Sequence, residues 1–266
     1  VQTCALPIWQ VRLAARASDR TRDMVGIVDW LNREVAEAGV DVRLNSPVAA
    51  AEVLDCGPDV VIVATGGWPD TDVLSPGAAG GDLLVSVAEV VGGHVAVGPR
   101  TLVFDDHGNL QALSCVEYLL DRDAEVQLVT PDRAVGHELD GTLHPAYLER
   151  FHADGVEMVP DHRLVGASRS DGRLEAVLRN VYTGSEQTSI VDPIVVEHGV
   201  VPIDDLFLEL RDRSANGGEL DVDAYISGRP QPRPDGGFRL FRIGDAVAGR
   251  DIHTAIYDAR RLCQVL

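Results

Sequence analysis

Apolar and polar positions alternate along the first part of the chain with the periods of one helix and two strands. Between residues 21 and 38 apolar side chains recur every three or four positions, which predicts an amphipathic helix with Gly39 in the C′ position. Residues 40–45 alternate as a half-buried strand. Residues 58–67 are continuously apolar, which is typical of a parallel strand covered on both faces.

A second series of elements follows a Pro- and Gly-rich stretch at residues 68–81, which predicts a linker. The predicted helices are 82–92, 110–121 and about 143–153, and the predicted strands are 101–106, 125–129, 156–160 and 192–199. A β-hairpin is expected over 163–180, turning at Asp171-Gly172. Because strands and helices alternate, we expect a mostly parallel sheet with helices on both faces.

The last segment, residues 236–266, predicts a strand, a Gly-Asp turn and an amphipathic helix. The apolar stripe of that helix consists of Ile252, Ala255, Ile256, Ala259, Leu262 and Cys263. With 266 residues, the chain is long enough for one large or two medium domains with proper cores.

Charge and cysteine content restrict the possible partners and cofactors. The formal net charge is −19 and every basic residue is Arg, which argues against nucleic acid and anionic membranes. No apolar run reaches the roughly 18 residues of a membrane span, and no secretory signal is recognised, so we expect a cytoplasmic protein. The four cysteines form no C-x-x-C, so no metal site is predicted. Cys115 and Cys263 are expected to be buried.

The first nine residues fit nothing that follows them. The stretch resembles a translated sequencing adapter, so residues 1–9 are interpreted as a non-native leader and left out of fold reasoning. On this interpretation the chain is a C-terminal piece of a longer protein.

Two short motifs stand at the ends of predicted strands. Ala64-Thr65-Gly66 ends the first buried strand, and Gly244-Asp245 ends the last strand, shortly before a helix. Ligands of doubly wound sheets bind at the carboxyl ends of strands. Glycine there permits close approach of the backbone, Asp accepts hydrogen bonds from ligand hydroxyls, and a helix N-terminus favours anions. Each motif is weak alone, but their order around an α/β segment is more specific.

Residues 103–119 have the strand–turn–helix layout of a dinucleotide-binding domain without its glycines. The glycine positions of a G-x-G-x-x-G turn fall on or near His107, Asn109 and Ala112. His107 cannot make the close approach of glycine, whereas Asn109 can adopt left-handed geometry. Asp105 and Asp106 add charge that repels a phosphate by roughly 3 kcal/mol per pair at about 5 Å. The turn therefore predicts a domain that keeps the nucleotide-binding scaffold but no longer binds NAD(P)H.

The motif order resembles the two-dinucleotide-domain flavoproteins, in which an NAD-type domain is inserted into an FAD-type domain. Residues 12–31, 102–119, 125–131 and 240–263 further resemble the C-terminal half of trimethylamine dehydrogenase-like proteins. This family includes dimethylamine dehydrogenases, N-methylproline demethylases and, more distantly, 2,4-dienoyl-CoA reductases. The resemblance covers essentially all of residues 10–266.

The resemblance implies an N-terminally truncated α/β protein with two Rossmann-like doubly wound domains. The expected FAD- or ADP-binding domain consists of residues 10–68 and 201–266, and the inserted, degenerate NAD-like domain of residues 69–200. No catalytic residue is expected in this chain. The cofactor-binding residues that the resemblance implies are Thr65, Gly66, Gly67, Gly244, Asp245, His253 and Thr254.

The family also implies cofactors and partners outside this chain. FMN and a [4Fe–4S] cluster are expected in an N-terminal barrel that is missing here, and an electron-transferring flavoprotein is an expected acceptor. FAD or ADP is expected to bind this region weakly, NAD(P)H is not expected, and oligomerisation stays open. The implied function is the electron-transfer half of an enzyme that oxidatively demethylates an N-methylated amine. The alternatives are a fragment of an NADPH-dependent enoate or 2,4-dienoyl-CoA reductase, and a non-catalytic ADP- or FAD-binding docking module.

Three further features have structural interpretations. His107 is read as a turn residue, and Asp204-Asp205 as a solvated helix start rather than a metal site. Glu197-His198-Gly199 stands where a second strand-end motif would lie and is read as structural, with contact to a flavin as the alternative.

Overall fold

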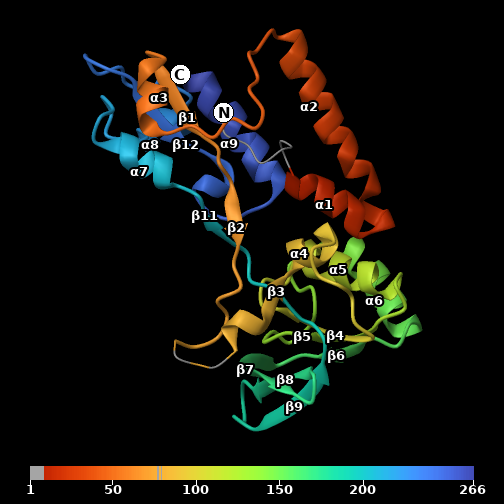
Figure 1. Cartoon of the computed structure of the whole chain (residues 1–266). Coiled ribbons are helices and arrows are strands. Elements are labelled where there is room, and N and C mark those ends of the chain that lie inside the picture. Colours follow the sequence, from red (N-terminus) through yellow and green to blue (C-terminus); the bar gives the residue numbers. More distant parts are fainter. Residues whose placement is uncertain (1–8, 77, 79) are drawn as a thin grey trace. The chain divides into compact units, whose positions relative to one another are not determined.

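The computed structural model describes residues 9–76, 78 and 80–266, and these form two compact units (Figure 1). Unit 1 consists of Val35–Trp68 and Val200–Leu266, and unit 2 of residues 9–34 and Pro69–Gly199. The predicted leader, residues 1–9, lies outside the described residues except for Trp9, which begins the first helix.

Unit 2 is built on a five-stranded parallel sheet with the order β3-β10-β4-β5-β6. Its strands are β3 (Leu84–Ser86), β4 (Arg100–Asp105), β5 (Glu125–Val129), β6 (Glu157–Val159) and β10 (Ile194–Glu197). Its helices are α1 (Trp9–Ala17), η1 (Asp19–Met24), the start of α2 (Val25–Glu37), η2 (Gly81–Leu83), α4 (Val87–Gly92), α5 (Leu110–Leu120) and α6 (Leu143–Ala153). A second, antiparallel sheet has the order β7 (His162–Ser170), β8 (Arg173–Asn180) and β9 (Glu186–Val191).

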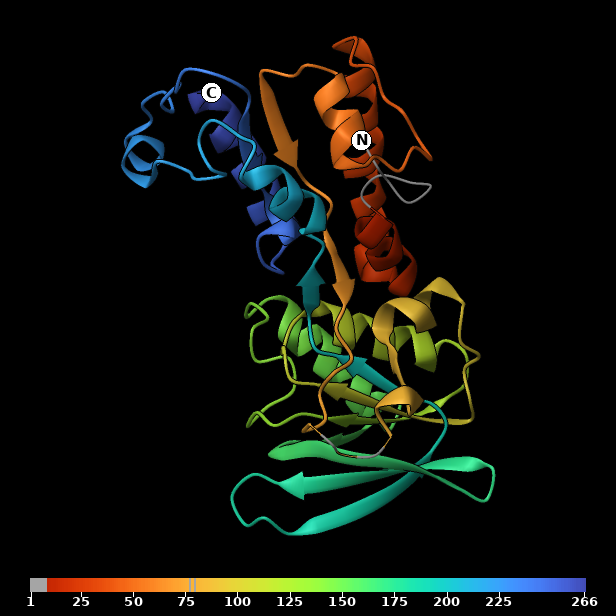
Figure 2. The ribbon, with the colours of Figure 1, turned by 60° about the vertical axis from the view of Figure 1, so that its left-hand side comes forward.

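Among the described residues, the α-helices of unit 2 lie on one face of its parallel sheet, and only the short η2 packs on the other face. Alternate side chains of β4 diverge: Val103 packs into a core with α4, α5 and α6, whereas Leu102 and Phe104 pack against β7, β8 and β9. Figure 2 shows the antiparallel strands as a separate layer beneath the parallel sheet. The prediction of helices on both faces was therefore wrong for this unit, because the hairpin and the unpredicted β9 form a sheet large enough to cover the second face.

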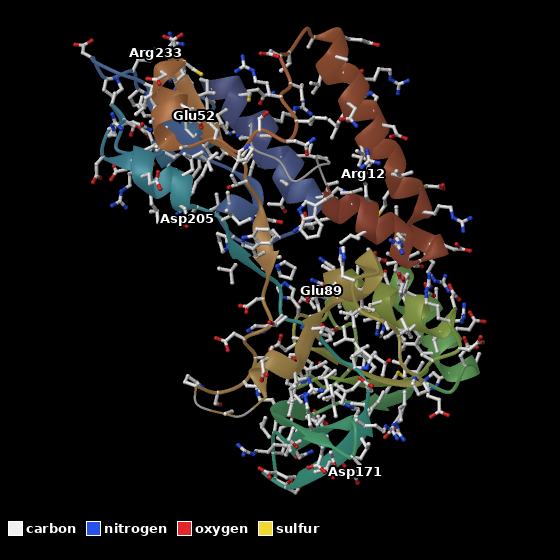
Figure 3. The ribbon with its side chains drawn as sticks, viewed as in Figure 1. Arg12, Glu52, Glu89, Asp171, Asp205 and Arg233 are labelled. Atoms are coloured by element: carbon white, nitrogen blue, oxygen red, sulfur yellow. The ribbon has the colours of Figure 1, made fainter. Side chains whose placement is uncertain are left out.

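Several predicted elements of unit 2 are confirmed, and one needed correction. β5 and α6 match their predicted bounds, and Asp171 and Gly172 turn the hairpin with φ of 48° and 81°. The predicted helix at 82–92 begins only at Val87, because Ser86 accepts the N–H of Glu89 and Glu89 (Figure 3) caps back onto Ser86. Residues 84–86 form β3 instead.

Residues 9–34 pack with unit 2, although the predicted boundaries place residues 10–68 in the other domain. Ala17 belongs to the same core as α4 and α5. Ser18 donates to the Glu117 carboxylate of α5, and Arg20 Nε donates to the same carboxylate at 2.9 Å. These polar contacts and the shared core explain why residues 9–34 belong to unit 2. Which unit corresponds to the FAD-type domain and which to the NAD-type domain stays a prediction.

Unit 1 contains two small pairs of strands. β1 (Val60–Val63) pairs with β12 (Arg239–Arg242) in parallel. β2 (Gly67–Pro69) pairs with β11 (Val200–Pro202) in the antiparallel sense, because the Ile203 N–H donates to the Gly66 carbonyl and the Asp70 N–H to the Gly199 carbonyl. Its helices are α3 (Ala50–Asp55), α7 (Asp205–Arg211), α8 (Val222–Ser227), η3 (Gly244–Ala246) and α9 (Ile252–Val265). Its core joins α3 and α7 to Val63 and Leu240.

The strand predicted at residues 40–45 is absent from unit 1 as described. Val40, Val42 and Leu44 are about half exposed, and no neighbouring strand pairs with them. β1 was expected to be covered on both faces, yet only Val63 of β1 is fully buried. Both expectations were wrong because an alternating or apolar pattern forms a covered strand only where a ladder partner and a second layer are present.

Candidate functional site

The two strand-end motifs of unit 1 lie side by side at one edge of the β1–β12 pair. Val63 is the register partner of Arg242, and the Ile243 N–H donates to the Val63 carbonyl at 3.0 Å. Thr65 and Gly244 therefore follow neighbouring strand ends, as the sequence predicts. This edge is the candidate site.

Thr65, Gly66 and Gly67 have different roles at this edge. The Thr65 hydroxyl donates to the carbonyl of Ile203. Gly66 has a φ of 78°, and nothing lies within 4 Å of the position its Cβ would take. A Cβ on Gly67 would lie 2.8 Å from the Val201 carbonyl oxygen, so this glycine is required for the close approach of β2 and β11. Of the three, Gly66 presents open backbone to a ligand.

The second motif lies against the start of α9. Gly244 has a φ of 61°, and a Cβ there would lie 3.6 Å from Ala255 of α9. The half-buried Asp245 accepts the N–H of Arg250 at 3.2 Å. Asp251 caps α9 by accepting the N–H and hydroxyl of Thr254 at 2.7 and 2.8 Å, which lowers the pKa of Asp251. Thr254 is therefore used by the helix cap, and His253 is exposed on the first turn.

Sequence reasoning missed Arg242, the last residue of β12. Its guanidinium donates to Asp204 at 2.5 Å and lies over the Phe207 ring at 4.7 Å from the centroid. Asp204 was expected to be solvated but is paired, whereas Asp205 (Figure 3) is exposed in the first turn of α7. The only local signal was an Arg at the end of an apolar strand.

The described residues at this edge fit the hydroxyl-bearing part of a nucleotide cofactor better than its pyrophosphate. Gly66 and Gly244 allow close approach, and Asp245 supplies a carboxylate that accepts from hydroxyl groups. Asp251 adds negative charge at the start of α9, while Arg242 and Arg250 pair with Asp204 and Asp258. Phosphate would meet carboxylates there, so the assignment of the seven predicted residues to FAD or ADP stays a prediction.

The 266-residue chain is expected to bind FAD and ADP weakly, because the described edge offers no glycine-rich turn to a pyrophosphate. Titration of the purified chain with each nucleotide, followed by flavin fluorescence or calorimetry, checks this. Gly66→Val is the matched variant, because its side chain would fill the open position. Stoichiometric FAD retained through purification contradicts the expectation.

The corresponding edge of unit 2 is closed by its own side chains. The Asp105 carboxylate, which is 0% exposed, accepts the backbone N–H groups of His107 and Gly108 at 3.1 and 2.9 Å. Gly108, and not Asn109, has the left-handed backbone, with a φ of 69°. Asn109 has a φ of −111° and caps α5 by accepting the Gln111 N–H. The predicted register of the turn was therefore one residue off at this position.

Two further contacts cover the turn. A Cβ on Gly108 would lie 2.2 Å from Nδ1 of His137, and the Glu138 N–H donates to the Gly108 carbonyl at 2.9 Å. Asp106 accepts from His198 Nδ1 at 2.8 Å when that nitrogen carries the proton. His107 is an exposed turn residue, as predicted. The backbone donors that would hold a phosphate in a working turn are thus engaged within the chain.

Burial raises the pKa of both carboxyl groups at this edge, and that of Glu197 the more. Burial raises the pKa of Asp105 to about 6 against the lowering effect of its two backbone hydrogen bonds. Burial, followed by repulsion from Asp105, raises the pKa of Glu197 to about 8. Glu197 of β10 is the register partner of Asp105 of β4.

The predictions about the two cysteines have mixed outcomes. Cys115 is buried as expected, but Cys263 is exposed, because only Leu262 of the predicted α9 stripe is fully buried. Within the described residues, no cluster of His, Cys, Asp and Glu could hold a metal ion. None of the helices in that part of the chain is long and apolar enough to cross a bilayer.

No family model matches the chain, but it is similar to several curated oxidoreductases. It is 39% identical over 259 residues to the "Probable N-methylproline demethylase" of Rhizobium meliloti (strain 1021), which covers 96% of this chain and 38% of that protein. It is 37% identical over 266 residues to the "N,N-dimethylglycine/sarcosine dehydrogenase" of Chromohalobacter salexigens. It is 38% identical over 265 residues to the "Multifunctional alkene reductase/demethylase OYE" of Caballeronia cordobensis. Each match covers 38% of the relative's length.

A solved structure supports the same fold. Histamine dehydrogenase from Rhizobium sp. 4-9 matches with a TM-score of 0.75 over 96% of this chain and 36% of that chain, at 21% identity. The predicted resemblance is thereby confirmed: the relatives of this chain are flavoprotein oxidoreductases of the amine dehydrogenase and demethylase type. The chain spans about 38% of the length of the curated relatives.

Proposed function

We propose that this chain, a homologue of part of these flavoprotein oxidoreductases, is the nucleotide-binding, electron-transfer part of a longer enzyme that oxidatively demethylates an N-methylated amine or amino acid. The observation that carries the proposal is the 39% identity to an N-methylproline demethylase over 96% of the chain. The relative named for N,N-dimethylglycine and sarcosine supports the same substrate class, because both compounds carry N-methyl groups.

In this proposal the residues of unit 1 bind and orient the sugar part of FAD or ADP. Gly66 and Gly244 leave the backbone open, and Asp245 accepts from ligand hydroxyls. FAD supplies two-electron chemistry through its flavin when it is bound, and ADP supplies none. FMN and a [4Fe–4S] cluster would be held by the part of the enzyme outside this chain.

We further propose that unit 2 does not bind NAD(P)H. Asp105 accepts the N–H groups of His107 and Gly108, and His137 covers Gly108. A pyrophosphate would have to displace a buried carboxylate and then lie beside it. Electrons from the amine would therefore leave to a separate protein such as an electron-transferring flavoprotein.

The full-length enzyme is expected to be reduced by an N-methylated amine but by neither NADH nor NADPH. The measurement is the flavin absorbance of the enzyme under anaerobic conditions after each addition, with sarcosine, dimethylglycine and N-methylproline as the amines. A non-methylated amino acid, glycine or proline, serves as the matched control. Rapid bleaching of the flavin at micromolar NAD(P)H would overturn the proposal that unit 2 does not bind NAD(P)H. A flavin spectrum that none of the three amines changes would overturn the proposed demethylase activity.

An NADPH-dependent alkene or enoyl-CoA reductase is the second candidate. The observation that supports this second function is the 38% identity to a protein named both alkene reductase and demethylase. Bleaching by NADPH and reoxidation by an enoate would support it. A docking module without catalysis would show neither reaction when joined to its remaining domains.

A further inference from the structure

The carboxyl pair of unit 2, the buried Asp105 and the half-buried Glu197, plays no part in the proposed function, and its geometry leaves one oxygen unexplained. Asp105 Oδ1 accepts two backbone N–H groups, whereas Asp105 Oδ2 is buried and has no hydrogen-bond partner among the described residues. A buried acceptor without a donor costs about 1–3 kcal/mol. A donor is therefore expected next to Oδ2.

Glu197 is placed to supply that donor. It is the register partner of Asp105 on the adjacent parallel strand, and neighbouring strands lie about 4.8 Å apart. Its Oε1 accepts the Gly199 N–H at 3.3 Å, and neither Glu197 nor Asp105 forms an ion pair with an Arg in the described part of the chain. Two ionised carboxylates on register-paired residues would repel each other without a compensating cation.

We propose that Glu197 and Asp105 form a proton-binding site in which the protonated Glu197 donates its O–H to Asp105 Oδ2. Asp105 stays ionised because two N–H groups stabilise its charge, and Glu197 carries the proton because one N–H stabilises it less. The shared proton joins the end of β10 to the turn after β4. It thus stabilises the closed turn that excludes phosphate.

The titratable groups that act on this pair are Asp106 after β4, Asp132 in residues 131–138 and Cys115 on α5. The neighbouring histidines are His107, which lies against Gly199, His198, which bonds to Asp106, and His137, which lies against Gly108. Arg133 in residues 131–138 interacts with Tyr182 and Asp161 instead. The groups that act on the pair are acids or a thiol, so none offers it a permanent positive charge. The surroundings favour a bound proton.

The sign of the pH dependence follows from the raised pKa of Glu197. Its pKa rises from an ordinary 4.5 to about 8 on folding, so the folded unit binds more protons than the unfolded unit between these values. The stability that the proton contributes is fully present below about pH 4.5 and is lost as pH rises through about 8. Between pH 6 and 7.5 the opening constant is expected to rise about tenfold per pH unit.

The test combines infrared spectroscopy and hydrogen exchange on the 266-residue chain. At pH 7 the wild type is expected to show the carbonyl band of a protonated carboxyl group, and Glu197→Gln is expected to lack it. Exchange protection of α5 and β10 amides, corrected for intrinsic rates, should fall with pH in the wild type and stay nearly flat in Glu197→Gln. The amide of Gln keeps a donor for Asp105 Oδ2, so this variant is expected to fold.

Glu125→Gln, an exposed glutamate on the neighbouring β5, is the matched control and should keep both the band and the wild-type pH slope. A wild type without a protonated-carboxyl band at pH 7 overturns the proposal without any variant. A band that persists in Glu197→Gln assigns the proton to another group and overturns it as well. Equal pH slopes in the wild type and Glu197→Gln would do the same.

Discussion

Gly98→Ala is expected to destabilise unit 2 by about 3 kcal/mol, at the upper end of the cost of overpacking. A Cβ on Gly98 would lie 1.8 Å from the backbone carbonyl oxygen of Asp192. This steric clash is relieved only if the start of β4 moves away from the segment before β10. Because β4 and β10 pair in the middle of the sheet, such a movement disturbs their pairing. Urea unfolding followed by circular dichroism measures the loss.

Gly141→Ala is the control for this substitution. Gly141 lies in the same unit before α6, has no positive φ, and has nothing within 4 Å of its Cβ position. Its free energy of unfolding should stay within about 0.5 kcal/mol of the wild-type value. Equal midpoints for the two variants would show that the described approach of Gly98 to Asp192 is wrong.

Glu117→Ala is expected to release residues 9–34 from unit 2 and to lower its stability by about 2 kcal/mol. The buried Ser18 hydroxyl loses its acceptor, and Arg20 loses its 2.9 Å ion pair while keeping its 3.0 Å bond to the Ala146 carbonyl. Arg20 is about one-third exposed, so water replaces much of its lost partner and limits the cost. Urea unfolding measures this loss.

Limited trypsin digestion gives the local readout for the same variant. The chain contains no Lys, so early cleavage in Glu117→Ala should fall at the Arg residues of the first helices, Arg12, Arg16, Arg20 and Arg22. Glu149→Ala, an exposed glutamate on α6, should digest at the wild-type rate. Cleavage at the wild-type rate in Glu117→Ala would contradict the expectation that Glu117 holds residues 9–34 on unit 2.

The candidate site was partly readable from the sequence. A strand-end glycine followed by an acid or a hydroxyl residue is a local signal, and Gly66 and Gly244 have the open, left-handed backbones that such positions require. The partners of Thr65 and Thr254 were not readable. Thr65 bonds to Ile203, which is 138 residues away, and the cap by Asp251 competes with any ligand for Thr254.

The turn at residues 105–109 was likewise only partly predictable from the sequence. Its two acids indicated that phosphate is disfavoured, but the expected reason was repulsion from charges facing the ligand. The structure turns Asp105 inward onto the N–H groups of His107 and Gly108. An Asp three residues before a glycine can close such a turn locally, and this spacing was the available signal.

Local periodicity determined part of the elements of this protein, because side chains three or four apart share a helix face and alternate side chains share a strand face. It was sufficient for α6, β5 and the hairpin, and for the two strand ends that form the candidate site. The tertiary structure alone decided which strands found a partner, which unit residues 9–34 joined, and where Asp105 points. These outcomes depend on contacts between residues far apart in the chain, such as Ser18 with Glu117 and Asp105 with Glu197, and no local pattern contains them.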